Sequence, residues 1–221
     1  YFTPDEMERL IARLDSLARS GRRTPVTICK GVVRDIAVHP DTVDFVSIAA
    51  NCFVRPSDLK LLRHRHIRIH MHGDTPVLLI DSDHSKTTVR TSMTMPEAAR
   101  AYQRIVSRQE KRGRSIDPDD FVFMPQSHNR SYALREIRYQ IDLAMRAEGL
   151  KVDPKGMKRS LYSFRHTAFM DRLLNSDIDP VTLALNGRTS VAIISRFYGS
   201  HIEALKKIDV FLGSSERRGG I

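Results

Sequence analysis

The stretch from Leu161 to Gly199 constrains this chain more than any other. Apolar residues recur in it at helical spacing, and the pattern breaks at residues 175–180 and again at residues 186–187. The spacing therefore predicts three short helices joined by tight turns. Asp179 followed by Pro180 is typical of a helix start, because Asp caps free backbone N–H groups and proline fits the first helical position.

Composition limits the kind of partner and the environment of the chain. The 221 residues are 41% hydrophobic, which is enough to bury the core of one large domain or two small ones. Lysine and arginine number 36 against 26 acids, a net charge of +10. This balance favours an anionic partner such as nucleic acid, and a basic but inert surface is the alternative. We find no membrane span or signal peptide and predict a soluble, cytoplasmic protein associated with the nucleoid.

Helical periodicity runs through most of the remaining chain. We predict further helices over residues 3–20, 25–38, 41–52, 56–63, 96–112, 131–148 and 202–212. The helix at residues 41–52 is apolar on nearly every side, which predicts a central, buried position. Three short strands are predicted over residues 66–69, 77–81 and 88–95. The predicted fold is therefore mainly α-helical with a small three-stranded antiparallel β-sheet.

Two groups of residues could hold a metal or form a disulfide by residue type, but neither has the ligands or the spacing that this requires. The run of His64, His66, His70 and His72 lacks a cysteine or carboxylate to complete a four-ligand zinc site, so we predict a solvated basic face and no metal. Cys29 and Cys52 lie in apolar patterns without CxxC spacing, which predicts buried, reduced thiols.

Three basic features lie outside the opening stretch. Arg55 precedes Pro56, which restricts it to an extended conformation at a junction between helices; the alternative is an arginine that pairs with Asp58. Lys86 lies in the second predicted hairpin, where it could reach into a groove or be an ordinary exposed lysine. The loop over residues 151–159 is basic and could touch phosphates or simply be solvated.

Four motifs follow one another along the chain: VRPSDLKLL, SKTTVR, YSFRHTAFMDRLL and TSVAIISRFYG. Their order and spacing resemble those of the tyrosine recombinases, the phage-integrase family of DNA breaking and rejoining enzymes. The resemblance runs from Thr3 to about Leu212. It implies the family's catalytic-domain fold over residues 1–213, a flexible tail over residues 214–221, and the absence of the family's separate N-terminal DNA-clamping domain.

The resemblance also implies roles for single residues. Arg55 and Arg165 match the family's two catalytic arginines, Lys86 its hairpin lysine and Tyr198 its nucleophile. Two guanidiniums can offer forked hydrogen bonds to phosphate oxygens, and Lys86 would protonate the leaving 5′-oxygen. The product would be a 3′-phosphotyrosine that retains the bond energy, so no cofactor is implied. Considered alone, Tyr198 could equally be a core aromatic residue, and Arg165 could pair with a buried acid such as Asp171.

Two positions depart from the family pattern. The family usually has His three residues before the second arginine and His or Trp nine residues before the nucleophile, where this chain has Tyr162 and Thr189. Both can donate a hydrogen bond to a phosphate, but neither is a useful base near neutral pH. Arg188, a cation beside Thr189, could partly compensate for the missing His or Trp. The position after the second arginine is commonly His in the family, and here it is His166. The predicted DNA contacts are Arg188, His166, Lys158 and Arg159.

The resemblance implies double-stranded DNA as the partner. In the family, four protomers assemble on two duplexes and a C-terminal helix packs on a neighbour; here that helix would be residues 202–212. Free protomers would be monomeric or weakly associated. The alternatives are a catalytically impaired relative that only binds DNA, a protein-interaction scaffold, and a type IB topoisomerase, which shares the chemistry.

Overall fold

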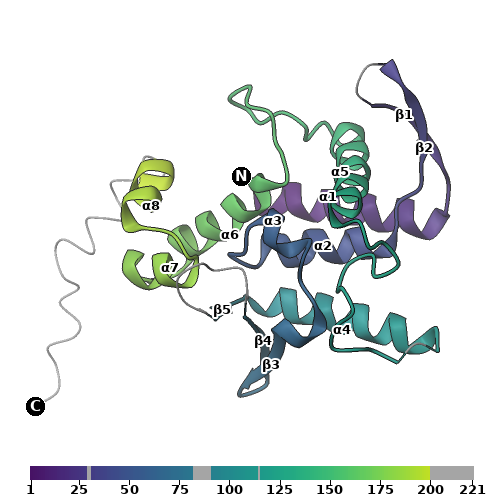
Figure 1. Ribbon diagram of the computed structural model, residues 1–221. Coiled ribbons are helices and arrows are strands. Elements are labelled where there is room, and N and C mark those ends of the chain that lie inside the picture. Colours follow the sequence, from purple (N-terminus) through teal and green to yellow (C-terminus); the bar gives the residue numbers. More distant parts are fainter. Residues whose placement is uncertain (29–30, 82–90, 114, 200–221) are drawn as a thin grey trace, which may run out of the picture.

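The computed structural model describes residues 1–28, 31–81, 91–113 and 115–199 (Figure 1). Its helices are α1 (Pro4–Ser20), α2 (Pro40–Ala50), α3 (Pro56–Leu59), α4 (Pro96–Lys111), α5 (Arg130–Ala147), α6 (Tyr162–Asn175), α7 (Pro180–Asn186) and α8 (Val191–Tyr198). Its strands are β1 (Thr24–Thr27), β2 (Val33–Ile36), β3 (Ile67–His72), β4 (Thr75–Ile80) and β5 (Ser92–Met93). The predicted fold class is confirmed, with β3, β4 and β5 forming an antiparallel three-stranded sheet.

Helix α2 lies at the centre of the larger hydrophobic core. Its Phe45, Val46 and Ile48 are fully buried, and it contacts α1, α4, α5 and α6. Phe45 packs edge to face on Phe123, with ring centroids 5.0 Å apart. A helix that is apolar on nearly all sides is stable only when it is surrounded by other elements, as the sequence predicted.

A second, smaller core joins the far half of α6 to α7 and α8, which lie together at one side of the molecule (Figure 1). Phe164 belongs to the larger core, and Phe169, five positions later on α6, belongs to the smaller one. Leu183 of α7 and Ile194 of α8 complete the contact. Helix α6 therefore connects the body of the domain to the hairpin of α7 and α8.

The prediction of a helix over residues 25–38 is wrong. The chain there forms an antiparallel hairpin in which Thr24 pairs with Ile36 and Thr27 with Val33. The segment is rich in β-branched residues, which are stiff at χ1 and fit extended backbone well. Gly31, with φ of 77°, supplies the left-handed conformation that the connection between the strands requires.

Other local predictions are confirmed at the level of single residues. Thr3 and Glu6 form the reciprocal capping box that begins α1. The Asp179 side chain accepts from the backbone N–H groups of Val181 and Thr182 at the start of α7. Cys52 is fully buried as a free thiol, whereas Cys29 lies outside the described residues. Helix α3 is shorter than predicted and ends at Leu59.

The histidine run is a solvated face only in part. His64 and His66 are buried, and Nδ1 of His64 lies 2.8 Å from the hydroxyl of Tyr102. His70 and His72 are exposed on β3. Among the described residues, no three His, Cys, Asp or Glu side chains gather in a way that could hold a metal ion. Within the same ranges, no helix has the length and apolar character needed to cross a membrane.

Candidate functional site

A pocket of about 480 Å³ brings together residues that are far apart in the sequence. Its lining includes five of the six predicted catalytic residues: Arg55, Tyr162, Arg165, Thr189 and Tyr198. The sixth, Lys86, lies outside the described residues. Since these side chains come from α6, α8 and the turns before α3 and α8, only the tertiary fold assembles the pocket.

Arg165 is held at the inner wall of the pocket. Its side chain is only 4% exposed, and its Nη2 donates to the carbonyl of Gly187 at 2.7 Å. The alternative pairing with Asp171 is wrong, because Asp171 pairs with Arg172 at 2.7 Å. In the described part of the chain Arg165 makes no ion pair, so its charge remains available to an anion. Burial lowers the pKa of the guanidinium, which stays charged at any physiological pH.

Phe169 positions both Arg165 and Tyr198. The Arg165 guanidinium lies 5.0 Å from the centre of the Phe169 ring, and the Tyr198 ring stacks on the same ring at 5.4 Å. Gly187 allows this arrangement, because a Cβ there would lie 2.3 Å from Cζ of Phe169. The glycine is thus required for close approach, and its carbonyl binds Arg165.

Arg55 lies on the exposed side of the pocket. Its backbone is extended, with φ of −69° and ψ of 145°, as expected before proline. Its Nη2 donates to the carbonyl of Arg188 at 3.3 Å, and no ion pair with Asp58 is present among the described residues. Arg188, which is predicted to contact DNA, donates to the carbonyl of Ile80 at 3.2 Å. This contact ties the turn between α7 and α8 to the sheet.

Tyr198 and His166 are directly hydrogen-bonded. The hydroxyl of Tyr198 lies 2.6 Å from Nδ1 of His166, and Tyr198 is only 6% exposed. Burial raises the pKa of the Tyr198 phenol. Burial chiefly, with the positive charge of Arg165, lowers the pKa of His166 to about 4. At neutral pH the pair therefore consists of a protonated phenol and a neutral imidazole.

Sequence reasoning assigned His166 to DNA contact and missed this pairing. The spacing could have indicated that His166 faces the site, because Tyr162 and His166 are four residues apart and share one face of α6. Their rings lie 5.2 Å apart, and Tyr162 is 43% exposed at the mouth of the pocket. The backbone N–H of Thr189 donates to Ala184, and its side chain completes the lining.

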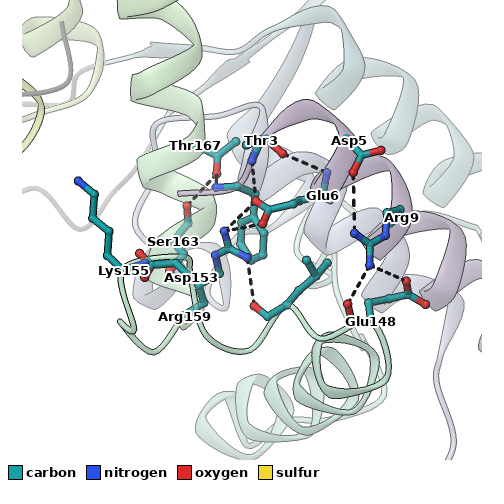
Figure 2. A network of polar contacts seen from close by, with 12 residues as sticks. Thr3, Asp5, Glu6, Arg9, Glu148, Asp153, Lys155, Arg159, Ser163 and Thr167 are labelled. Atoms are coloured by element: carbon teal, nitrogen blue, oxygen red, sulfur yellow. Dashed lines mark hydrogen bonds and ion pairs between the residues drawn. The ribbon is translucent and has the colours of Figure 1, made fainter.

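The predicted DNA contact by Arg159 does not fit the structure, because this residue is only 4% exposed. Its Nη2 donates to both carboxylate oxygens of Glu6, at 2.9 and 2.7 Å, and its Nη1 donates to the carbonyl of Leu150 at 3.2 Å (Figure 2). The guanidinium also lies 4.4 Å from the centre of the Phe2 ring. Arg159 therefore fastens α1 to the loop before α6, whereas the neighbouring Lys158 is exposed.

The fold is that of the catalytic domain of tyrosine recombinases, as the motifs implied. Three solved structures support this assignment. The match to the XerA recombinase structure covers 100% of this chain and 66% of the XerA chain, with a TM-score of 0.57 and 18% sequence identity. XerH site-specific recombinase, in a post-cleavage complex with a palindromic difH substrate, matches 98% of this chain and 53% of its own, with a TM-score of 0.61 and 13% identity.

The Tn1549 transposon integrase in complex with transposon right end DNA matches 96% of this chain and 66% of its own, with a TM-score of 0.57 and 15% identity. The chain therefore spans between 53% and 66% of the length of these structures. No protein-family model matches the chain, and no curated protein matches it in sequence. The likeness is one of fold.

Proposed function

We propose that this chain is the catalytic part of a site-specific recombinase that cleaves and rejoins double-stranded DNA through a 3′-phosphotyrosine on Tyr198. The observation that carries the proposal is the pocket in which Arg55, Arg165 and Tyr198 meet. Phosphoryl transfer needs a nucleophile and cations around a single phosphate. An arrangement of two guanidiniums beside a phenol provides both.

The chemistry follows from the charges. The transition state places negative charge on the non-bridging phosphate oxygens, and arginine offers them charge-assisted, forked hydrogen bonds. Arg165 is fixed by Gly187 and Phe169, so little reorganisation is needed when the phosphate enters. Arg55 would contact the same phosphate from the exposed side of the pocket. Lys86 remains the candidate acid for the 5′-oxygen, and Tyr162 and Thr189 are candidate hydrogen-bond donors to the phosphate.

DNA as the partner is supported by two observations. The chain carries a net charge of +10. Among the structurally similar proteins, the Tn1549 integrase is described in complex with transposon right end DNA, and XerH as bound to a difH substrate. We propose that residues 1–213 act as the catalytic domain, that they assemble as tetramers on DNA, and that Lys158 contributes to phosphate contacts. Binding is expected to weaken steeply with added salt, because phosphate contacts release counterions.

A second candidate is a relative that binds DNA without cleaving it. The absence of His at positions 162 and 189, together with the buried, protonated phenol of Tyr198, favours this alternative. Both candidates predict salt-sensitive DNA binding, so only the chemistry separates them.

The test is to trap a covalent adduct on a nicked suicide substrate. We expect the wild-type chain to form an adduct that resists denaturation, and the Tyr198→Phe variant to bind the same DNA without forming one. If the wild-type chain binds but traps no adduct, the non-cleaving candidate is correct. Relaxation of supercoiled plasmid without a defined site would instead indicate a topoisomerase.

A further inference from the structure

We propose that His166 is a catalytic residue of this site: it takes the proton of Tyr198 as the phenol attacks the phosphate. This inference rests on the proposed function and deepens it. It supplies the base that position 162 lacks.

The geometry already meets the requirement for a general base. Nδ1 of His166 lies 2.6 Å from the Tyr198 hydroxyl, within the hydrogen-bond reach that proton transfer needs. His166 also lines the pocket that holds Arg55 and Arg165. Of the described residues in that lining, His166 is the one whose side chain has a basic nitrogen that can be neutral at pH 7.

The helix explains why the base is found at this position. Residues 162 and 166 are four apart on α6 and therefore adjacent on the same face. The family pattern usually has His at the first of them, where this chain has Tyr162. An imidazole one turn further along α6 still faces the pocket, and there it contacts the phenol from α8.

The charges around His166 determine its protonation. Among the described residues, the titratable groups whose rings contact His166 are Tyr162 on α6 and Tyr198 on α8, and its neighbour Arg165 acts on it by charge. A second cavity that His166 lines also holds Glu6, Asp153, Lys155 and Arg159. Burial, followed by nearby positive charge such as that of Arg165, lowers the pKa of His166 to about 4, which leaves the ring neutral and able to accept at Nδ1 but also makes it a weaker base. A bound phosphodiester adds a negative charge, which favours the imidazolium. The positive charge of Arg165, which would bind this phosphate, also favours the phenolate of Tyr198.

The step balances as follows. The O–H bond of Tyr198 breaks and its proton forms an N–H bond at Nδ1 of His166. The oxygen's electron pair forms the new bond to phosphorus, and the bond from phosphorus to the 5′-oxygen breaks. The departing oxygen keeps that electron pair and takes a proton from Lys86 or water. In the rejoining step, the 5′-hydroxyl gives its proton to Lys86 or water and its oxygen bonds to phosphorus. The bond from phosphorus to the Tyr198 oxygen breaks, and the protonated His166 returns its proton to the departing phenolate.

The first experiment compares His166→Asn with His128→Asn. Asparagine keeps a polar group near the position of Nδ1 but cannot accept a proton at neutral pH. His128 is exposed and distant from the pocket, so it controls for the substitution itself. In single-turnover adduct formation, we expect His166→Asn to be about 10²- to 10⁴-fold slower than wild type, and His128→Asn to be unchanged. The DNA affinity of all three proteins is measured in parallel, so that a loss of binding is separated from a loss of chemistry.

A second experiment separates the base from the acid. A substrate with sulfur in place of the bridging 5′-oxygen has a leaving group that needs no proton. It should not restore His166→Asn, and restoration would overturn the proposal by assigning His166 to the leaving group. His166→Ala leaves space beside the pocket, and added imidazole should restore adduct formation. If a folded, DNA-binding His166→Ala protein is not restored, proton transfer to residue 166 is refuted.

The outcomes also distinguish this inference from the proposed function. If wild type forms no adduct, the proposed function fails. If wild type forms the adduct and His166→Asn forms it at the same rate, the proposed function stands and the role of His166 is refuted.

Discussion

Adding one methyl group at Gly187 tests whether the packing around Phe169 positions Arg165 and Tyr198 as the proposed function requires. A Cβ at Gly187 would lie 2.3 Å from Cζ and 2.8 Å from Cε1 of Phe169, and 3.1 Å from the carbonyl of Leu183. Ordinary contact begins at 3.4 Å, so the Phe169 ring would have to move by about 1.1 Å. The ring cannot rotate away without losing its contacts, because it supports the Arg165 guanidinium on α6 and the Tyr198 ring on α8.

The size of the effect follows from this displacement. Overpacking of this kind costs about 1–3 kcal/mol of the free energy of unfolding. A misplacement of about 1 Å among reacting groups costs about 10²-fold in rate. We therefore expect Gly187→Ala to fold, to unfold at lower denaturant concentration, and to form the covalent DNA adduct about 10²-fold more slowly than wild type.

Gly199→Ala is the matched control. Gly199 directly follows Tyr198 and has an ordinary helical φ of −58°. Apart from its chain neighbours, no atom of the described residues lies within 4 Å of a Cβ built there. The assays are urea unfolding followed by circular dichroism and single-turnover adduct formation on the nicked substrate. If Gly187→Ala matches Gly199→Ala in both stability and rate, packing on Phe169 does not position Arg165 and Tyr198.

Three further predictions concern the surroundings of the site. Glu6→Gln keeps a side chain suited to the capping box but leaves the buried guanidinium of Arg159 without its charge partner. The free energy of unfolding, measured by urea titration, should therefore fall by about 3 kcal/mol. Unchanged stability would show that this ion pair does not stabilise the fold. Burial raises the pKa of Glu6, but hydrogen bonds from Thr3 and Arg159 outweigh it and hold the pKa below its usual value. The stabilisation is therefore present above the ordinary carboxyl pKa and is lost as the pH falls through the lowered pKa, so wild type should lose more stability than Glu6→Gln on acidification. Lys158→Ala should reduce the slope of log affinity for DNA against log salt by about one, and an unchanged slope would show that Lys158 does not contact phosphate.

Much of the fold could be predicted from the sequence because the signals are local. The boundaries of α6, α7 and α8 follow from apolar spacing within a few residues and from the Asp179 cap. The hairpin over residues 24–36 was misassigned, since a short apolar run fits either periodicity and the pairing partner decides. Its β2 strand is held to α5 by Arg34, whose guanidinium donates to Glu136 more than one hundred residues away.

The candidate site, like the fold, could be predicted from the sequence only in part. The sequence by itself determined which residue types occur in which order: two arginines, a lysine and a tyrosine on predicted helices and turns. Only the tertiary structure decided that Arg159 is buried against Glu6, 153 positions away, and that His166 meets Tyr198 across two helices. The physical reason is that a helical pattern specifies which side chains share a face, whereas the partner of that face depends on how the helices pack. Charge and hydrogen bonding then follow the packing, so a basic loop residue such as Arg159 can form a buried ion pair, and His166 can become the hydrogen-bond partner of Tyr198.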